Sequence, residues 1–504
     1  MVDAAVSKAA ELSSCGFESH LRYHCIAPAA ARPSKTALDA ARDSTNVIAA
    51  QRPPEPRAAA HPPPREVGRW AALATTVAAL IALSSPFDVF ATDSIYGDPL
   101  GQPKTPKLPI DGQRFDASFR FRGVYAQNRT SLDSARDDAS REVHQRMRVG
   151  AAFGKGPVDA YFQVQSAGTL GSPARFDADS SSSRVGASLG LQQGWARWRW
   201  PLIDGFEVQA GRMALEYGAG RRIGRYDFHE TGNAFDGVRV GWKPGDFVSI
   251  DLLAVRIRAA DSSSDTRTLL GTYIVTKPAS IITTDVYFLF ADDRGKSRAE
   301  NVNMGLRVVL RPWYWMEWDA EGAVQYGTVT PQGYSNPLDH LATSLATELR
   351  MRGHLGVPLG FNLRFQRHSG DNDTVDDASA AWRPLYPSLA RQVGVLQLFP
   401  QSNLVQYGIG VRIGDRNDVR VLVDTRFSGA MSHSRVPAFN QPVLKFDDTW
   451  APLGTEVNAR AVLPTENAGE IQLVGALFSP SAVLSEHVGE ATMHQYFVQW
   501  ALQF

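Results

Sequence analysis

Long segments in which apolar and polar side chains alternate dominate the chain after residue 114. Residues 114–125 read R-F-D-A-S-F-R-F-R-G-V-Y, and phenylalanine or alanine occupies every second position from 115 to 121. Such alternation indicates a β-strand whose two faces meet different environments. Strands of soluble proteins usually have five or six residues, whereas tilted strands of about ten residues cross a bilayer. The pattern therefore predicts membrane-spanning strands with one face in lipid and the other in water.

Eighteen such segments follow one another along the chain. They begin near residues 114, 142, 157, 190, 206, 235, 247, 268, 282, 301, 314, 342, 361, 403, 418, 455, 470 and 493. Short turns that contain Pro, Gly or Asp alternate with longer polar connections. The longer connections are predicted at 129–140, 166–188, 216–234, 258–267, 291–300, 327–340, 369–402, 428–453 and 479–492. Short periplasmic turns and long extracellular loops are typical of an outer-membrane β-barrel.

The last segment strengthens this interpretation. Residues 494–504 read H-Q-Y-F-V-Q-W-A-L-Q-F, and every second residue from Tyr496 to Phe504 is apolar or aromatic. A final strand with this pattern that ends on phenylalanine resembles the strand by which outer-membrane barrels are recognised for assembly. We therefore expect the barrel assembly machinery to be a partner, with Phe504 as the recognised residue.

Together these features predict an all-β fold, a transmembrane antiparallel β-barrel of about 18 strands that occupies residues 114–504. Lipid around the sheet requires closure, because an open edge would leave backbone groups unpaired in hydrocarbon. Such a barrel encloses an aqueous lumen, so the expected function is passage of a solute across the bacterial outer membrane. A secreted β-sandwich or solenoid is the alternative.

Composition excludes several other classes of protein. The formal net charge is +0, which gives no reason to expect a nucleic-acid partner. No run of about 18 apolar residues occurs, so a bundle of membrane-spanning helices is excluded. Cys15 and Cys25 are the two cysteines and do not form a C-x-x-C motif, so no thiol chemistry is expected downstream. We expect no cofactor.

The N-terminal region precedes the alternating segments and differs from them in composition. Residues 1–66 are rich in Ala, Pro and Arg, and we interpret them as a disordered leader or as sequence upstream of the true translation start, near Val67. Residues 92–113 are expected to form a periplasmic segment that leads into the barrel.

Between these two parts lies a predicted signal peptide over residues 67–91. Basic residues precede thirteen uncharged residues at 71–83, and a small residue, Ala91, closes the stretch. A basic start, a short apolar core and a small residue at the cleavage site are the pattern of an export signal. A single membrane anchor is the alternative, although thirteen residues are short for a helical span.

The polar face of each predicted strand should line the lumen, and it is rich in arginine. The arginines expected to select the solute are Arg120, Arg122, Arg146, Arg148, Arg197, Arg199, Arg212, Arg239, Arg350, Arg352 and Arg364. The acids among the inward residues are fewer and include Glu317, Asp319, Glu321, Glu348 and Glu456. Arginine in a pore favours anions, and its planar fork matches a carboxylate, above all on a polymer with one per sugar. Alternatively, these arginines pair with acids across strands and brace the wall.

The stretch W-A-R-W-R-W at residues 195–200 illustrates the two faces. Trp198 and Trp200 should face outward at the periplasmic end of a strand, where an aromatic girdle is expected. Arg197 and Arg199 should face the lumen. Trp195 would share their face, and the pattern does not explain a tryptophan there.

Seven short motifs follow one another along the chain: G-R-M-A-L-E-Y-G-A-G-R-R (211–222), F-D-G-V-R-V (235–240), M-G-L-R (304–307), R-H-S-G-D (367–371), W-R-P-L-Y (382–386), S-N-L (402–404) and G-T-E-V-N (454–458). Together they resemble the alginate-export family of outer-membrane porins. The resemblance implies an 18-stranded barrel that passes a polyuronate through an arginine-lined constriction gated by loops. Residues that match the motif arginines are Arg212, Arg221, Arg222 and Arg239. Asn458 stands where the family often has aspartate. The resemblance implies a polyuronate-like (alginate-like) polysaccharide or oligosaccharide, and alginate itself does not follow from it.

Other candidate sites carry less specific patterns. The aspartates Asp371, Asp373, Asp376 and Asp377 suit a structural Ca²⁺ site in an extracellular loop, but their spacing is not that of an EF-hand, and a solvated acidic loop is the alternative. No G-x-S-x-G motif occurs, so we do not expect an enzyme. Two other functions stay open: a porin for small organic anions, and a barrel without transport function that acts as an enzyme or adhesin.

Overall fold

A computed structural model describes residues 111–129, 132–135, 138–170, 188–258, 266–295, 297–331, 334–371, 376–415, 418–431, 451–465 and 469–504. The interpretations of residues 1–66 and 67–91, the predicted cleavage near Ala91, most of the segment 92–113 and Asp373 lie outside the described residues. The first strand begins at Asp111, three residues before the predicted start.

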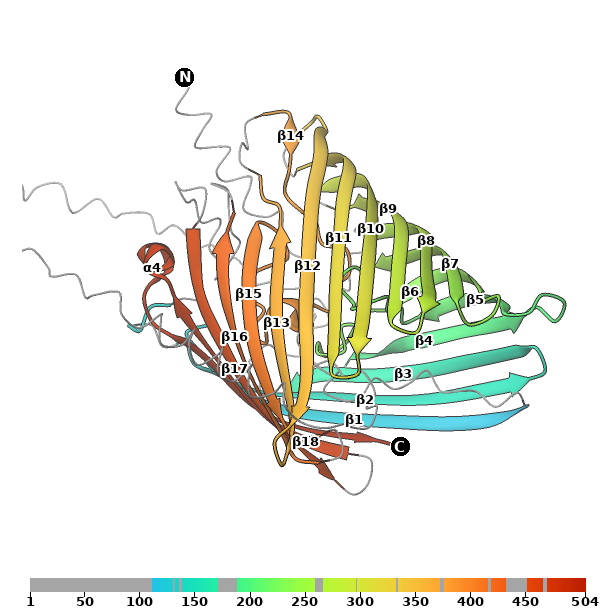
Figure 1. Cartoon of the computed structure of the whole chain (residues 1–504), viewed down its shortest axis with the longest axis horizontal. Coiled ribbons are helices and arrows are strands. Elements are labelled where there is room, and N and C mark those ends of the chain that lie inside the picture. The colour runs from blue at the N-terminus through green and yellow to red at the C-terminus, as the bar shows by residue number, and fades with distance from the viewer. Residues whose placement is uncertain are drawn as a thin grey trace, which may run out of the picture. The chain divides into compact units, whose positions relative to one another are not determined.

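Eighteen long antiparallel strands form one closed sheet (Figure 1). They are β1 (Asp111–Gln127), β2 (Ser140–Lys155), β3 (Val158–Leu170), β4 (Ser188–Arg199), β5 (Phe206–Met213), β6 (Phe235–Trp242), β7 (Val248–Arg258), β8 (Thr266–Ala279), β9 (Ile282–Arg294), β10 (Arg298–Trp313), β11 (Met316–Thr330), β12 (Leu338–His354), β13 (Pro358–His368), β15 (Leu404–Ile413), β16 (Arg420–Ala430), β17 (Ala451–Thr465), β18 (Gly469–Pro480) and β19 (Met493–Gln503). The two-residue β14 (Ala378–Ser379) pairs in parallel with the end of β12 and is not part of the wall. The predicted all-β barrel is confirmed.

The C-terminal strand closes the barrel by pairing with the first strand. β19 pairs with β1 from Ser118↔Gln503 to Gln127↔His494, and β1 also pairs with β2. Phe504 extends this edge, because its N–H donates to the carbonyl of Ala117. Recognition of Phe504 by the assembly machinery stays a prediction.

The two faces of each strand differ as the alternation predicts. On β9 the outward residues Val286, Phe288 and Phe290 are exposed, Phe288 by 56%. The inward residues Tyr287 and Leu289 between them are buried. An apolar exterior and a covered interior are what a lipid-surrounded barrel requires.

Aromatic side chains gather where the strands end at the short turns. Trp198 and Trp200 lie 4.5 Å apart between ring centroids at the end of β4, and both are exposed. Trp195 faces inward and is buried. Its ring contacts Tyr161 of β3 (centroids 5.8 Å apart) and lies beneath the Arg197 guanidinium at 5.5 Å. Trp195 therefore packs the inner wall, which explains the one residue that the sequence pattern left unexplained.

The connections alternate between short and long, with one correction. The short connections span two to six residues. The connection at 156–157 is one of the shortest, and the connection at 414–419 is one of the longest. The predicted long loop at 291–300 is wrong, since β9 ends at Arg294 and β10 begins at Arg298. Asp293, Ala299 and their neighbours continue the ladder instead. Charged residues at the end of a long strand resemble a loop in sequence.

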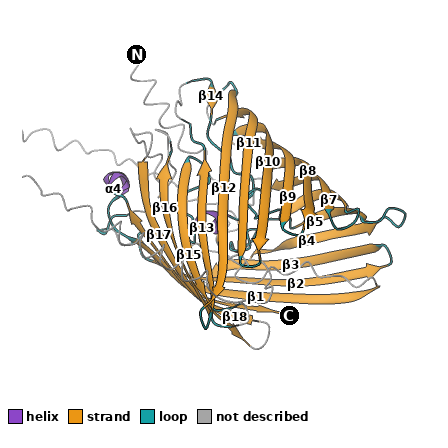
Figure 2. Cartoon of the chain, viewed as in Figure 1, coloured by secondary structure: helices purple, strands orange, loops and turns teal. Residues whose placement is uncertain are grey.

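In the described parts of the long connections there are two short helices, α3 (Leu389–Val393) between β13 and β15 and α4 (Ala482–Val488) between β18 and β19 (Figure 2). Ser481 caps α4, because its side chain accepts from the Leu484 N–H. Within the described ranges, no helix has the length and hydropathy needed to cross a membrane.

Candidate functional site

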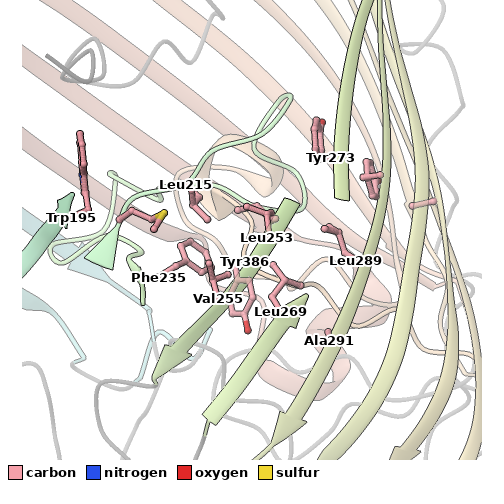
Figure 3. Close-up of a cluster of buried hydrophobic side chains, with 14 of the residues drawn as sticks. Trp195, Leu215, Phe235, Leu253, Val255, Leu269, Tyr273, Leu289, Ala291 and Tyr386 are labelled. Atoms are coloured by element: carbon pink, nitrogen blue, oxygen red, sulfur yellow. The ribbon is translucent and has the colours of Figure 1, made fainter. Parts of the chain in front are cut away.

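Two of the long connections pack against the inner wall of the barrel. We name residues 214–234, between β5 and β6, the crossing loop, and residues 369–403, between β13 and β15, the long loop. Leu215 and Ile223 of the crossing loop share a buried apolar cluster with Trp382 and Tyr386 of the long loop. The inward side chains of the wall complete it, including those of Leu253 and Leu289, and Figure 3 shows Leu215 and Tyr386 beside them. Burial of these apolar side chains holds both loops inside the barrel.

The two loops are also joined to each other through their backbones. Ile223 and Tyr386 form a parallel β-bridge. The Tyr386 N–H donates to the Arg222 carbonyl and the Gly224 N–H donates to the Tyr386 carbonyl, both at 2.8 Å. The Ser388 N–H donates to the Gly220 carbonyl at 2.9 Å. The loops therefore form one connected structure in the lumen.

The first half of the crossing loop binds an acidic part of the wall. Arg221 donates to Asp319 at 2.8 Å and lies 3.2 Å from Glu321, both on β11. Arg222 lies 3.1 Å from Glu321 and donates to the Tyr287 hydroxyl of β9 at 2.9 Å. Its guanidinium also lies over the Trp382 ring at 4.6 Å. These buried charges are paired, as burial requires.

The second half of the loop binds a basic part of the wall, on β1 and β2. Asp227 accepts from Arg148 at 2.7 Å, and its backbone carbonyl accepts from Arg120 at 2.6 Å and from Arg146 at 2.9 Å. We name Arg120, Arg122, Arg146 and Arg148 the arginine cluster. The register places them together, since Arg120 pairs with Arg146 and Ser118 with Arg148.

Glu230 makes the other acidic contact with this wall. Its carboxylate lies 2.6 Å from His144 Nδ1 and 3.5 Å from Arg122. The loop thus presents basic residues to the acidic strands and acidic residues to the basic strands. Since β1–β2 and β9–β11 lie far apart in the strand order, the crossing loop spans the lumen between them.

Both loop carboxylates are held in the charged form. Burial alone would raise the pKa of Asp227, but Arg148 and Arg146 outweigh it and hold that pKa well below its usual range. Burial likewise opposes ionisation of Glu230, and the His144 hydrogen bond together with the Arg122 charge lowers its pKa. At neutral pH both groups therefore stay anionic.

The long loop is fixed to the opposite part of the wall by its backbone carbonyls and one backbone N–H. Arg364 of β13 donates to the Arg391 carbonyl at 3.1 Å, and Arg426 of β16 donates to the Gln392 carbonyl at 2.6 Å. Glu456 of β17 accepts from the Leu396 N–H at 3.2 Å. These wall residues secure α3 and the turn after it.

The structure gathers most of the predicted arginines into three groups on the lumen face. The first is the arginine cluster. The second group consists of three arginines and four acids: Arg307, Arg350, Arg364, Glu317, Asp319, Glu321 and Glu348. Within it, Arg307 pairs with Asp319 at 2.8 Å and Arg364 pairs with Glu348 at 2.7 Å. The third comprises Arg197, Arg199 and Arg239 with Asp159, Glu207 and Asp251, at distances from 2.7 to 3.5 Å. Arg352 lies on the lumen face of β12.

Arg212 is a correction to the predicted lumen set. It lies on β5 between Gly211 and the buried Met213, on the face that carries Ala210 and Val208. Its side chain is 38% exposed and pairs with Asp236 of β6, which is 52% exposed. Arg212 therefore faces outward, because the strand places every second residue on the lipid side. Glu456 faces inward but lies apart from the other acids, at the long loop.

The proposed Ca²⁺ ligands are only partly described. Asp371, Asp376 and Asp377 flank the residues that the structure omits, and Asp373 is one of these. In the described part of the chain, no group of three or more His, Cys, Asp or Glu side chains is arranged to hold a metal ion. The Ca²⁺ site stays a prediction.

Sequence reasoning missed the residues of the crossing loop that bind the arginine cluster. Asp227 and Glu230 lie in R-R-I-G-R-Y-D-F-H-E, where basic residues precede acidic ones and large apolar residues alternate with them. A loop in solvent has no need of Ile223, Tyr226 and Phe228. That apolar content was the available signal that this loop turns inward.

A closed barrel with an apolar exterior, a charged lumen and inward loops defines an integral outer-membrane channel of the porin type. Comparison with known proteins agrees with this class. The family model for alginate export matches residues 112–498, so the chain belongs to the alginate export family.

Solved structures with the same fold include OccAB4 from Acinetobacter baumannii, at 11% identity over 79% of this chain and 100% of that chain, with a TM-score of 0.51. OpdK from Pseudomonas aeruginosa, determined with vanillate, shares 12% identity over 77% of this chain and 98% of that chain, also with a TM-score of 0.51. At such identities the likeness concerns the fold alone. No curated protein sequence gives a significant match.

Proposed function

We propose that this porin passes anionic saccharides of the polyuronate class through its arginine-rich lumen. The observation that carries the proposal is the arginine cluster, which binds carboxylates of the chain itself. Four wall arginines face two carboxylates of the crossing loop, Asp227 and Glu230, at distances of 2.7 and 3.5 Å. A wall that binds carboxylates in the lumen offers the same chemistry to a polymer with a carboxylate on each sugar.

Further guanidiniums continue this lining toward the short-turn side of the barrel. Arg199 lies at the end of β4 and is 39% exposed, and Arg239 of β6 is partly exposed. Each of these guanidiniums pairs with acids of the wall and is also exposed to the lumen. A passing carboxylate can therefore exchange one arginine for the next. Weak binding at several sites is what passage through a pore needs, because a tightly bound solute would not leave.

Ion selectivity tests the charge part of this proposal. In planar bilayers under a KCl gradient, the reversal potential of the native channel should be shifted from zero toward the equilibrium potential of chloride, the chloride side of zero. The double substitution Arg197→Gln and Arg199→Gln should move it toward zero, because two lumen cations are lost. The double substitution Arg294→Gln and Arg298→Gln removes two exposed outward arginines and serves as the matched control, with no expected shift. Cation selectivity of the native channel would contradict the proposal.

Passage of small organic anions is the second candidate function. It is favoured by the crossing loop, which is anchored to both walls and restricts the lumen to small solutes while it stays in place. One structural neighbour, OpdK, was determined with vanillate. Anion selectivity without any block by a polyuronate would favour this candidate. Transport of either kind accords with the family better than an enzyme or adhesin does.

A further inference from the structure

A row of charges interrupts the outward, lipid-facing surface of β5, β6 and β7. Arg212 pairs in register with Asp236, and Asp236 pairs with Arg256. The Arg212 Nη1 lies 3.3 Å from the Asp236 carboxylate. Arg256 is exposed on the other side of Asp236. The next outward residues toward the short turns are apolar, Ala210, Val238 and Ala254.

This row lies too deep for the usual edge of the apolar band. On β6, Asp236 is six residues from Trp242 at the periplasmic end, a rise of about 15 Å for a strand tilted by about 40°. On β12 the largely apolar outward face runs from Met351 to Leu341, a rise of about 25 Å, which is the usual height of the band. The apolar exterior is therefore about 10 Å lower at β5–β7 than at β12.

The wall ends early here because the chain turns into the lumen. β5 and β6 have eight residues each, and the crossing loop that joins them leaves the exterior at once. The strands on either side, β4 and β8, are longer and carry apolar outward residues, such as Leu189 and Leu191 of β4 and Leu270 of β8. The charged row thus forms the floor of a notch in the exterior. We name Arg212, Asp236 and Arg256 the exterior notch.

The notch carries two guanidiniums and one carboxylate, and so an excess of one positive charge. Lipid chains cannot solvate these groups, whereas an anionic headgroup can. Asp236 uses one nitrogen of Arg212, and the planar fork has further N–H donors for a tetrahedral anion. Asp236 itself repels an anion, so the two arginines on either side must supply the attraction.

We propose that the exterior notch binds the phosphate group of an anionic membrane lipid, whose headgroup enters the bilayer at β5–β7. Arg212 and Arg256 hold the phosphate from the two sides of Asp236, and the longer strands β4 and β8 flank the acyl chains. The site belongs to the exterior and does not depend on the solute that the lumen carries. It also gives Arg212, which takes no part in the lumen, a role.

Native mass spectrometry of the full barrel in neutral detergent tests this site. The probes are dioleoylphosphatidic acid and dioleoylglycerol, which differ only in the phosphate. The native protein should retain phosphatidic acid and not dioleoylglycerol. The double substitution Arg212→Gln and Arg256→Gln should weaken retention about tenfold, since charge-assisted hydrogen bonds are lost. Asp236→Asn should retain the lipid at least as strongly as the native protein.

Two comparisons make the result specific. The double substitution Arg311→Gln and Arg420→Gln removes two lumen arginines with the same change of charge and should leave retention unchanged. Inorganic phosphate at millimolar concentration should not displace the lipid, because acyl chains contribute to binding. Equal retention by the Arg212 and Arg256 variant and the native protein would overturn the proposal. So would a dimer of the chain that survives lipid removal and is lost in that variant, since the notch would then bind a second copy.

Discussion

Removal of the crossing loop is expected to give a channel of much larger conductance. In the variant, residues 216–232 are replaced by a short Gly-Ser linker between β5 and β6. The loop spans the lumen from β11 to β1–β2 and fills it together with the long loop. Because an 18-stranded wall encloses a wide aqueous lumen, we expect the single-channel conductance to rise on the order of threefold or more. Single-channel recording in planar bilayers measures this.

Folding of this variant is checked separately from its conductance. The strands and their register do not include the deleted residues, so the barrel should keep the heat-dependent electrophoretic mobility of a folded outer-membrane barrel. A correctly folded variant with native conductance would show that the solute path does not run past the crossing loop.

Neutralising the two loop carboxylates is expected to loosen the second half of the crossing loop at the wall and to raise anion selectivity. In the double substitution Asp227→Asn and Glu230→Gln, the arginine cluster loses both of its carboxylate partners from the loop. Breaking a buried ion pair by removing one partner costs about 3–5 kcal/mol, because the other charge is left uncompensated. The reversal potential in a KCl gradient should move further toward the chloride side, and protease should cut the loop more readily.

A matched substitution separates this effect from a general change of charge. The double substitution Asp292→Asn and Glu300→Gln removes two carboxylates on the outward face, and it should leave selectivity unchanged. If this variant shifts the reversal potential as much as the loop variant does, the arginine cluster does not set selectivity.

The same two carboxylates set the dependence on pH. Their pKa values are lowered in the folded protein, so the stability that they contribute is complete above the usual carboxyl pKa of about 4 and is lost as the pH falls through the lowered values. Recordings from neutral pH down to about pH 5 should therefore show a constant conductance, with release of the loop only in stronger acid. Release between pH 7 and pH 5 would contradict the assignment.

The wall of the barrel could be predicted from the sequence because its physical rule is local. A strand between lipid and water must alternate, and all eighteen predicted starts fall within four residues of the observed ones, such as 235 for β6 and 493 for β19. The error at 291–300 arose where the strands extend past the apolar band, because outward residues such as Asp292 and Glu300 are then as polar as those of a loop.

The interior could not be predicted in the same way. Which loop turns inward depends on contacts between residues distant in sequence, such as Arg222 with Tyr287 and Asp227 with Arg148. Arg212 shows the limit of a motif, since the register places it outside although it shares the motif with the lumen residues Arg221 and Arg222. The alternative interpretation is that the lumen arginines pair with acids across strands and brace the wall. It applies to the second group of lumen residues, where Arg307 pairs with Asp285 and Asp319.

The central claim is that a polyuronate enters this lumen because of its carboxylates. The most direct measurement records single native channels in planar bilayers while polymannuronate, or neutral dextran of matched length, is added to one side. The account predicts discrete blockades by polymannuronate that become more frequent when the voltage drives anions into the pore and rarer at high salt, which screens the charges. Dextran should give none. Equal block by both polymers, or no block by polymannuronate in a conducting channel, would contradict the account.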